Sequence, residues 1–539
     1  MFFKFKWQWW WWKFITIQKI RIFLRRYQFR HWSKTAVFIG LSTVIAISLS
    51  LYLITQKPSP LTQQDKLITH DRRKVTLFNW HRLYEIDTFG QILASPLISA
   101  LDANKGGDIL IANSLGAIYG FAGNDGSLVY EFNLGERIIA SPFMIDVGTI
   151  TSQPATKSHT QQTTALEPFI IAETGLFYVL AITTAQTKGD YLYRSRNAKR
   201  SNRLVFGTPA YGITHNQQGM VFIGDNQGTV SAYESRYGRL VWTNDISFDK
   251  NEVLFAPPVL LLTDHLPSPA EVETIATQRE DTTLKLPSDL VIAASTKGTI
   301  AALNAETGAP NWIFSVTNEA ALLNNIEDGV RSAMNVGNFL TTAPGMELAL
   351  ITHLGKGELF SAWGERYCQF NLNGLFVSAL GKGIFYTTES KLQLLAISTR
   401  GDFYTIGMTE TITNKTDVAI TCDVRLLAER NQATFLSSAI LEDFNGDHIT
   451  DILIASRQGE LFLLNGQNGE DLLPPLALGY ALTATPAVAD MTGDGNIEVI
   501  LAGENGTVTV LTLLTRPENN FKPYENISKM FLRTTHHHN

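Results

Sequence analysis

The sequence contains one pattern twice near its C-terminus, as FLSSAILEDFNGDHITDILIASRQGELFLLNGQNGE (residues 435–470) and as ALTATPAVADMTGDGNIEVILAGENGTVTVL (residues 481–511). Each copy joins a short apolar strand, an acidic loop, a β-branched run, a polar turn with glycine and a further strand. Short β-branched runs between Gly and Asn turns predict an antiparallel meander. One meander of this size cannot bury a core alone, so the pattern predicts a fold built from stacked copies.

Weaker copies fill most of the remaining chain, and two alternating markers identify them. The first is a pair of small residues on an apolar strand: Ser95-Pro96, Ser141-Pro142, Thr208-Pro209, Pro257-Pro258, Ser332-Ala333, Ser378-Ala379, Ser438-Ala439 and Thr485-Pro486. The second is a turn glycine after a β-branched run: Gly116, Gly175, Gly228, Gly298, Gly357, Gly401, Gly459 and Gly506. Four-stranded units around an axis form a β-propeller, so we expect an all-β, eight-bladed propeller over residues 75–515.

The ends of the repeat predict how the ring closes. The last unit lacks an outer strand, whereas VTLFNWHRLYEI (Val75–Ile86), which resembles one, precedes the first unit. Outer strands of other units carry an aromatic residue at a fixed offset after a turn glycine: Tyr130, Trp242 and Trp312. We expect the N-terminal strand, with Trp80, to complete the eighth blade and leave no free sheet edge.

Two acidic loops at the same place in adjacent units present oxygen ligands at alternate positions. The first set is Asp443, Asn445, Asp447, the backbone of Ile449, and Asp451. The second set is Asp490, Thr492, Asp494, the backbone of Asn496, and Glu498. Ca²⁺ binds six to eight oxygens, and a tight glycine-containing loop can wrap such an ion. The sequence predicts one or two structural Ca²⁺ ions, with the alternative that the carboxylates only cap turn amides.

The N-terminal region predicts a membrane anchor. Residues 36–54 are apolar and uncharged, close to the roughly 20 residues that a spanning helix needs. Residues 1–35 contain nine Lys or Arg and no Asp or Glu, so the positive-inside rule places the N-terminus in the cytoplasm and the rest outside. The apolar run is long for a cleaved signal, which favours an uncleaved transmembrane signal-anchor helix. Residues 55–74 are a polar linker and residues 516–539 a tail.

Several segments leave alternatives open. The tryptophans of residues 1–35 belong either to an interfacial segment or to an exaggerated aromatic anchor. Residues 149–167 and 264–288 are insertions that we expect to be flexible and to share a face with the acidic loops. The basic run of residues 194–203 is a solvated loop or a docking patch for an acidic partner. Cys368 and Cys422 form one disulfide, if exported, or remain two buried thiols.

The repeats also resemble known families. The loop D-x-[NT]-G-D-x-x-x-[DE] followed by a β-run is similar to the FG-GAP repeats of integrin α-subunit propellers and their bacterial relatives. The unit GTIAALNAETGAPNW (residues 298–312) resembles repeats of PQQ-like propellers. That superfamily includes quinoprotein dehydrogenases and the eight-bladed lipoprotein of the outer-membrane β-barrel assembly machinery. The resemblance covers about residues 75–515 and implies an eight-bladed ring with calcium in two loops.

The residues argue against an enzyme. Quinoprotein dehydrogenases that resemble this fold use a vicinal Cys-Cys pair and tryptophans in nearly every blade, whereas Cys368 and Cys422 are far apart in the sequence. The propeller has only four tryptophans: Trp80, Trp242, Trp312 and Trp363. No Ser/His/Asp set, HExxH motif or phosphate-binding glycine loop is present, so we expect no catalytic and no organic cofactor-binding residues.

We therefore expect a binding protein of the cell envelope. The prediction is a scaffold or assembly factor in the inner membrane of a Gram-negative bacterium, with its propeller in the periplasm and other envelope or surface proteins as partners. The net charge of −6 gives no case for nucleic-acid binding. An adhesion or ligand-recognition propeller at the cell surface is the first alternative, and a quinoprotein-type dehydrogenase is a weaker one.

Overall fold

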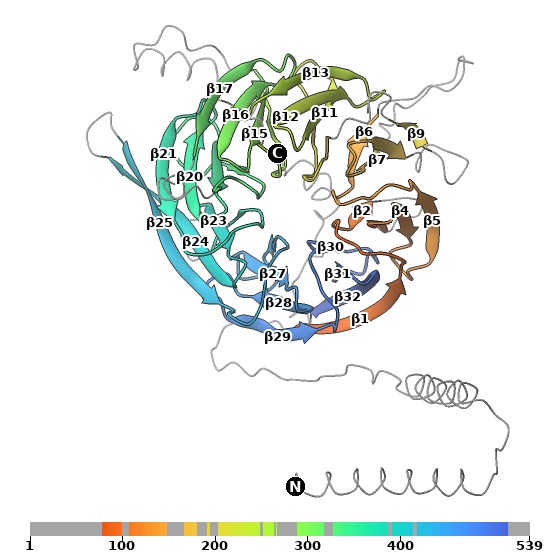
Figure 1. Ribbon diagram of the computed structural model, residues 1–539. Coiled ribbons are helices and arrows are strands. Elements are labelled where there is room, and N and C mark those ends of the chain that lie inside the picture. Colours follow the sequence, from red (N-terminus) through yellow and green to blue (C-terminus); the bar gives the residue numbers. More distant parts are fainter. Residues whose placement is uncertain are drawn as a thin grey trace, which may run out of the picture. The chain divides into compact units, whose positions relative to one another are not determined.

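The computed structural model describes residues 78–99, 107–147, 166–180, 191–194, 203–247, 252–263, 266, 288–316, 327–385, 391–412 and 418–515. Their 32 strands form eight four-stranded sheets, arranged as the blades of a ring (Figure 1). All strand pairs within the blades are antiparallel, as in β24 with β25 and β1 with β32. The expected all-β, eight-bladed propeller is confirmed.

The first four blades follow the chain in order. Blade 1 consists of β2 (Leu97–Ser99), β3 (Asp108–Ala112), β4 (Ala117–Phe121) and β5 (Leu128–Asn133). Blade 2 consists of β6 (Phe143–Asp146), β7 (Leu166–Ile171), β8 (Phe177–Leu180) and β9 (Tyr191–Arg194). Blade 3 consists of β10 (Ala210–Ile213), β11 (Gly219–Gly224), β12 (Thr229–Glu234) and β13 (Leu240–Asp245). Blade 4 consists of β14 (Val259–Leu261), β15 (Leu290–Ala294), β16 (Thr299–Asn304) and β17 (Pro310–Ser315).

The remaining blades continue this order, except that the last one borrows its outer strand. Blade 5 consists of β18 (Asn335–Gly337), β19 (Glu347–Ile351), β20 (Lys356–Ser361) and β21 (Arg366–Asn371). Blade 6 consists of β22 (Gly381–Gly383), β23 (Gln393–Ile397), β24 (Asp402–Ile412) and β25 (Val418–Glu429). Blade 7 consists of β26 (Ile440–Glu442), β27 (Asp451–Ala455), β28 (Glu460–Leu464) and β29 (Asp471–Ala477). Blade 8 consists of β30 (Ala487–Ala489), β31 (Ile497–Ala502), β32 (Thr507–Thr515) and β1 (Phe78–Asp87).

The second strand of each blade is rich in apolar residues because both of its faces are covered. All five residues of β3, β15, β19, β23 and β27 are buried. Strands buried on both faces carry continuous apolar runs instead of alternating ones. The apolar clusters span neighbouring blades, and one of them joins Ile292 of blade 4 to Leu348 and Phe360 of blade 5. The hydrophobic core is therefore a series of layers between blades.

The small-residue pairs hold the inner strands together. The Ser95 N–H donates to the Ser141 hydroxyl (3.0 Å), and the Ser141 N–H donates to the Thr208 hydroxyl (3.2 Å). Across the ring, the Ser438 N–H donates to the Thr485 hydroxyl (3.0 Å). These bonds link one blade to the next where the inner strands begin. The marker recurs because a small side chain with a hydroxyl fits this position and also satisfies a backbone donor.

The aromatic marker of the outer strands has a similar linking role. The Trp242 indole N–H donates to the carbonyl of Ala305 in blade 4 (2.9 Å), and that of Trp312 donates to the carbonyl of Ala362 in blade 5 (2.8 Å). Gly308, at φ +70°, lies so close to the Trp242 ring that a β-carbon would collide with it. Each of these aromatic side chains thus supports the outer turn of the following blade.

Strand β1 closes the ring by pairing with β32 from Phe78↔Thr515 to Asp87↔Thr507. The prediction that an N-terminal strand completes the eighth blade is therefore confirmed. Figure 1 shows this strand, drawn in orange, beside the blue C-terminal strands. The closure joins the two ends of the repeat within one sheet and covers the edge of β32.

The aromatic residue that links blade 8 to blade 1 is Tyr84, not Trp80. Its hydroxyl donates to the Gly123 carbonyl (2.7 Å), and Gly126 lies against its ring. A bulge between Arg82 and Tyr84 interrupts the register of β1, much as a bulge interrupts the outer strand pair of blade 3. Trp80 packs instead with the apolar cluster between blades 7 and 8.

Blade 6 departs from the common pattern because its outer hairpin is long. Strands β24 and β25 pair as far as Ile412↔Val418 and extend beyond the ring (Figure 1). Cys422 on this hairpin is joined by a disulfide to Cys368 on β21 of blade 5, with their Cα atoms 5.7 Å apart. The structure thus shows the disulfide, one of the two alternatives that the sequence left open, and the bond links the outer strands of neighbouring blades.

The ring has two faces, defined by which connections they carry. The loop face carries the loops between first and second strands and the turns between third and fourth strands. The connector face carries the segments that join one blade to the next, including those with Phe206 and Phe255. Strand registers place Phe78, where the described propeller begins, and Thr515, where it ends, on the loop face.

The predicted N-terminal segment, membrane span and linker (residues 1–74) and the tail (residues 516–539) lie outside the described residues. So do residues 149–165, most of residues 264–287 and residues 195–202 of the basic run. Leu166 and Glu167 belong to β7 and not to the predicted insertion. Within the part of the chain that the structure describes, no helix is both long and apolar enough to cross a membrane.

Candidate functional site

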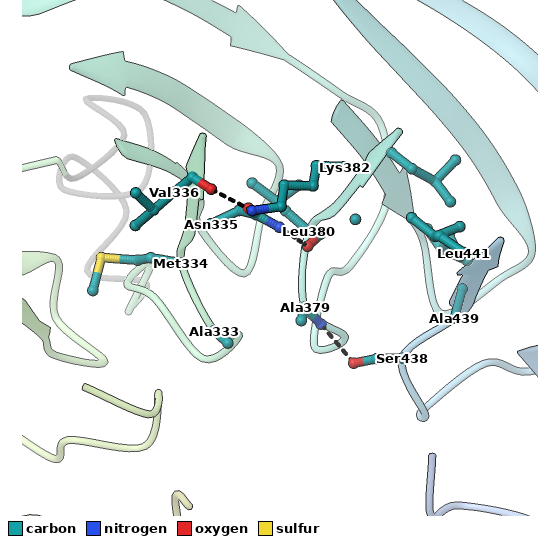
Figure 2. Close-up of a pocket in the computed structure, with 13 residues that line it drawn as sticks. Ala333, Met334, Asn335, Val336, Ala379, Leu380, Lys382, Ser438, Ala439 and Leu441 are labelled. Atoms are coloured by element: carbon teal, nitrogen blue, oxygen red, sulfur yellow. Dashed lines mark hydrogen bonds between the residues drawn. The ribbon is translucent and has the colours of Figure 1, made fainter. Parts of the chain in front are cut away.

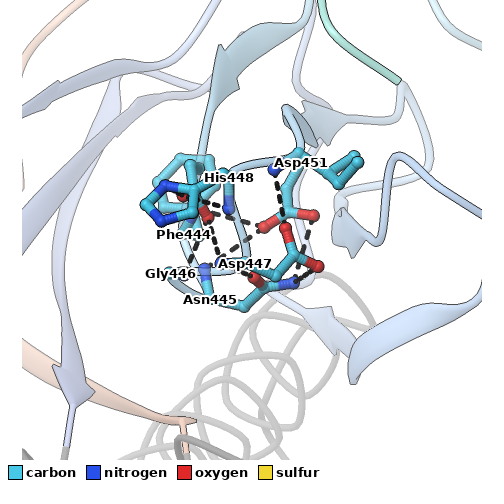
Figure 3. Close-up of polar contacts among 8 residues, drawn as sticks. Phe444, Asn445, Gly446, Asp447, His448 and Asp451 are labelled. Atoms are coloured by element: carbon cyan, nitrogen blue, oxygen red, sulfur yellow. Dashed lines mark hydrogen bonds and ion pairs between the residues drawn. The ribbon is translucent and has the colours of Figure 1, made fainter. Parts of the chain in front are cut away.

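The first acidic loop joins β26 to β27 on the loop face. The Asp443 carboxylate accepts backbone N–H bonds from Gly446 (2.7 Å), Asp447 (3.1 Å) and His448 (2.8 Å). The Asp447 carboxylate accepts one from Ile449 (2.8 Å), and the Asp447 N–H donates to the side-chain oxygen of Asn445 (2.8 Å). Figure 3 shows Asn445 and Asp447 side by side in this loop. These bonds draw the chain into a tight loop in which Gly446 and His448 both have positive φ values, 76° and 67°.

The second acidic loop joins β30 to β31 and has nearly the same bonds. Asp490 accepts backbone N–H bonds from Gly493 (2.7 Å), Asp494 (3.1 Å) and Gly495 (3.1 Å). The Asp494 carboxylate accepts one from Asn496 (2.8 Å). The two loops are structural equivalents, as their sequences predicted, with Gly495 in the place of His448.

The last ligand position of each loop has a role that sequence analysis missed. The Asp451 carboxylate is buried and accepts the N–H of Phe444 (3.1 Å), and that of Glu498 accepts the N–H of Met491 (2.6 Å). In blade 5, which lacks an acidic loop, Glu347 likewise accepts the N–H of Phe339 (2.7 Å). This position therefore closes the loop between first and second strands whether or not the loop is acidic.

Burial and neighbouring charges raise the pKa of the Asp451 and Glu498 carboxyl groups. Burial raises the pKa of Asp451 to about 7, with a further contribution from the charges of Asp447 and Asp443. Burial raises the pKa of Glu498 to about 7 as well, and Asp494 and Asp490 add to the shift. Each acidic loop thus concentrates three carboxylates, one of them poorly solvated, in a short stretch of chain.

The hydrogen bonds of the two loops bear on the calcium prediction. They show the arrangement expected if the carboxylates only cap turn amides, because the carboxylates and the Asn445 side chain accept N–H groups of the loop itself. Among the described residues, no three His, Cys, Asp or Glu side chains are grouped so that they could hold a metal ion. The ligand types nevertheless fit Ca²⁺, because each loop offers carboxylate and backbone carbonyl oxygens in a short stretch of chain.

Glu347 offers a pH-dependent prediction. Burial raises its pKa from 4.5 to about 7, against three backbone hydrogen bonds that lower it. Because the folded protein holds this proton to higher pH than the unfolded chain, stability falls as pH rises from about 4.5 to 7. Gln393 occupies the same position in blade 6 and accepts the Phe385 N–H (3.2 Å). We expect Glu347→Gln to stabilise the protein above pH 7, by up to roughly 3 kcal/mol.

The measurement for Glu347→Gln is chemical denaturation of the variant and the wild type across pH 5 to 8. The difference in the free energy of unfolding is expected to grow as the pH rises, because only the wild type must ionise a buried group. Glu460→Gln, a change at a partly exposed β28 position, is a control that should show no such trend. A constant difference across the series would contradict the assignment.

A cavity of about 230 Å³ lies between the inner strands of blades 5, 6 and 7 (Figure 2). Its lining is apolar apart from Asn335, Lys382 and Ser438. The Lys382 ammonium donates to the Val336 carbonyl (2.7 Å), and burial lowers its pKa. No sequence pattern indicated this cavity, since its residues come from three separate units.

An exposed aromatic pair lies on the connector face. Phe206, between β9 and β10, stacks on Phe255, between β13 and β14, with ring centroids 5.6 Å apart and planes inclined at 24°. Phe255 is 44% exposed and Phe206 is half-buried. Beside them Arg203 pairs with Asp225 (3.1 Å). Apolar rings bordered by a polar ion pair are typical of the centre of a protein–protein interface.

Sequence comparison links this part of the ring to a known family. Residues 179–326 match the family model described as outer membrane protein assembly factor BamB. The match includes blades 3 and 4 entirely and contains both Phe206 and Phe255. No curated protein matches the sequence.

Solved structures support the same fold. BamB from Moraxella catarrhalis is 15% identical over 80% of this chain and 100% of that chain, with a TM-score of 0.50. Sqt1 from Saccharomyces cerevisiae is 12% identical over 81% of this chain and 99% of that chain, with a TM-score of 0.52. The family match makes residues 179–326 similar to PQQ-like, BamB-type repeats, and the solved structures support the propeller fold of the whole ring. The FG-GAP resemblance remains a prediction.

Proposed function

We propose that the protein is a non-enzymatic scaffold that binds other proteins of the cell envelope during assembly, and that it is anchored in the inner membrane by residues 36–54. The observation that carries the proposal is the exposed Phe206–Phe255 pair, located inside the segment that matches an outer membrane protein assembly factor. A BamB-type propeller is consistent with a position in the envelope. The anchor and its orientation rest on the apolar span and its nine flanking cations.

The aromatic pair has the physical properties of a binding site. Aromatic side chains bury large areas at little conformational cost, and they dominate the energetics of many interfaces. Backbone hydrogen bonds hold the segments that carry both residues, since the Val205 N–H donates to the Glu173 carbonyl (2.9 Å) and the Leu254 N–H donates to the Asp225 carbonyl (3.0 Å). The Trp242–Ala305 hydrogen bond also ties blade 3 to blade 4. The proposed partner therefore meets a preformed surface.

The experiment compares proteins that co-purify with full-length wild type and with Phe206→Ser/Phe255→Ser, extracted from native membranes in mild detergent. We expect the wild type to carry envelope proteins in stoichiometric amounts and the double variant to lose them while keeping its thermal midpoint. Phe89→Ser, at an 84% exposed residue of the same face, is the matched control and should retain the partner. Equal recovery with the double variant would contradict the assigned site.

We further propose that the acidic loops bind Ca²⁺ and that the ions rigidify the loop face without taking part in chemistry. Asp443, Asn445, Asp447 and the Ile449 carbonyl would hold one ion together with Asp451. Asp490, Thr492, Asp494 and the Asn496 carbonyl would hold the other together with Glu498. Bound cations would offset the repulsion among the carboxylates of each loop.

Removal of Ca²⁺ by a chelator is expected to lower the thermal midpoint. An ion present at a hundred times its dissociation constant contributes about 2.7 kcal/mol to stability. Asp447→Ala should reproduce most of the loss due to the first loop and reduce the further effect of chelator. Asp125→Ala removes a carboxylate from an exposed turn of blade 1 and should leave the chelator response unchanged. A wild-type thermal midpoint that is the same with and without chelator would rule out structural calcium.

A further inference from the structure

The outer turn of blade 3 differs chemically from the three other outer turns that share its geometry, those of blades 1, 4 and 7. The turns around Gly126, Gly238, Gly308 and Gly469 share one geometry, with the glycine at positive φ and its N–H bonded to the carbonyl four residues earlier. The two residues before the glycine are Asn124-Asp125, Glu306-Thr307 and Gln467-Asn468 in blades 1, 4 and 7. In blade 3 they are Arg236-Tyr237, and Arg239 follows the glycine. The fold therefore does not require the basic and aromatic residues found there.

These side chains form an exposed cationic and aromatic patch. The guanidinium carbons of Arg236 and Arg239 each lie 5.2 Å from the centre of the Tyr237 ring, which is 50% exposed. Neither arginine forms an ion pair with a carboxylate among the described residues. Leu240 (40% exposed) and Val241 (48% exposed) continue the patch along the start of β13. We call residues 236–241 the blade 3 patch.

We propose that the blade 3 patch docks on an anionic bilayer surface. Arginines attract anionic headgroups, and exposed Tyr, Leu and Val side chains favour the boundary between headgroups and acyl chains. The patch is positively charged, whereas the whole protein has a net charge of −6. Attraction to anionic lipid would therefore come from the patch and not from the overall charge of the protein. The inference rests on the proposed function, because it uses the anchor to bring the propeller to the membrane.

The position of the patch agrees with this orientation. Blade 3 presents the turn on the loop face, the face at which Phe78 connects the propeller to the N-terminal part of the chain. The predicted linker of 20 residues, residues 55–74, enters the propeller at this face. Two arginines contribute only about 1 kcal/mol each at a membrane surface. Tethering makes such weak docking effective by raising the local concentration.

The charges elsewhere on the loop face predict a tilted approach. Blade 7, which carries Asp443 and Asp447, lies diametrically opposite blade 3 in a ring of eight. Its acidic loop would be repelled by anionic lipid unless cations neutralise it. Docking through blade 3 alone lifts blade 7 away from the surface. The same chain therefore offers a matched control position in the equivalent turn of blade 7, at Asn468.

The test uses full-length protein with Leu240→Cys or Asn468→Cys, labelled with an environment-sensitive fluorophore; Cys368 and Cys422 are joined, so only the new thiol reacts. The protein is reconstituted into vesicles of phosphatidylethanolamine with phosphatidylglycerol, or of phosphatidylcholine alone. Brominated lipids should quench the probe at 240 in the anionic vesicles and not the probe at 468. Raised salt or phosphatidylcholine should remove the quenching. Arg236→Gln and Arg239→Gln should each lower the docked-to-undocked ratio about fivefold.

Two outcomes would overturn docking and remain distinguishable. Docking is refuted if the probe at 240 stays in water in anionic vesicles, or if the probes at 240 and 468 are quenched equally. If the protein still co-floats with the vesicles after a carbonate wash, the proposed anchor stands in that case. Failure to co-float refutes the proposed anchor and docking together. The thermal midpoint of each variant confirms that the propeller is folded, which is expected because the altered side chains lie at the surface.

Discussion

A chain that starts after Asp87 is expected to lose its cooperatively folded propeller and to aggregate. Strand β1 supplies nine paired residues to β32, from Phe78↔Thr515 to Asp87↔Thr507. It also supplies Tyr84, which links blade 8 to blade 1. Net hydrogen bonds are worth about 0.5–1.5 kcal/mol each, so the lost strand approaches the whole stability of a typical domain, roughly 5–15 kcal/mol. The exposed edge of β32 would then pair with other chains.

The matched control is a chain that begins at Asp71, which keeps β1 and removes the preceding residues. Circular dichroism, a denaturation curve and size-exclusion chromatography compare the two truncated proteins. The longer chain should unfold in one transition and elute as a discrete species. If the shorter chain behaves in the same way, ring closure by β1 does not stabilise the fold.

Replacement of both disulfide cysteines, Cys368→Ala/Cys422→Ala, is expected to lower the free energy of unfolding by about 4 kcal/mol. The bond joins residues 54 positions apart, and the chain-entropy relation gives a value of this size at 25 °C. The bond also holds the long β24–β25 hairpin against blade 5. Hydrogen bonds from Thr341 and Thr342 of blade 5 to the Glu410 carboxylate reinforce the hairpin there. Burial alone would raise the pKa of Glu410, but these hydrogen bonds lower it to about 2.

Reductant separates the effect of the bond from the effect of the two side chains. Wild-type protein should lose nearly the same stability when reduced, whereas the double variant should not respond. Intact-mass measurement after thiol blocking establishes whether the protein from native membranes contains the disulfide. Two blocked thiols in the native protein would mean that the bond does not form in its compartment, and the export prediction would be wrong.

The number of blades could be predicted from the sequence because it depends on local signals. Small residues pack beside the axis, turn glycines need positive φ, and buried strands are continuously apolar. Seven of the eight predicted turn glycines have positive φ, but the prediction was wrong in blade 5, where Gly355 makes the turn and Gly357 lies in β20. Closure by the N-terminal strand was predictable for the same reason. The last unit lacked an outer strand, and the strand before the first unit belonged to no unit of its own. The identity of the linking aromatic was not, because both Trp80 and Tyr84 were available and only the bulge after Arg82 selects between them.

The candidate site was harder to predict because its residues come from neighbouring blades and lie far apart in the sequence. Phe206 and Phe255 occupy equivalent positions, each two residues before the small-residue pair of its unit. The repeat alone did not single them out, and the packing of neighbouring blades brings them together. The Cys368–Cys422 bond depends on the extra length of the blade 6 hairpin strands β24 and β25, which carry Cys422 beside blade 5. The acidic loops were located correctly, but the sequence did not show that Asp451 and Glu498 close their own loops as Glu347 does in blade 5.

Cross-linking in native membranes, followed by mass spectrometry of the full-length protein, tests the scaffold proposal most directly. We predict stoichiometric cross-links from envelope proteins to the connector face around blades 3 and 4, close to Phe206 and Phe255. Lysines on the loop face should cross-link to those partners less often. A protein that is extracted alone, or whose cross-links spread evenly over both faces, would contradict the proposal that it holds an envelope complex together.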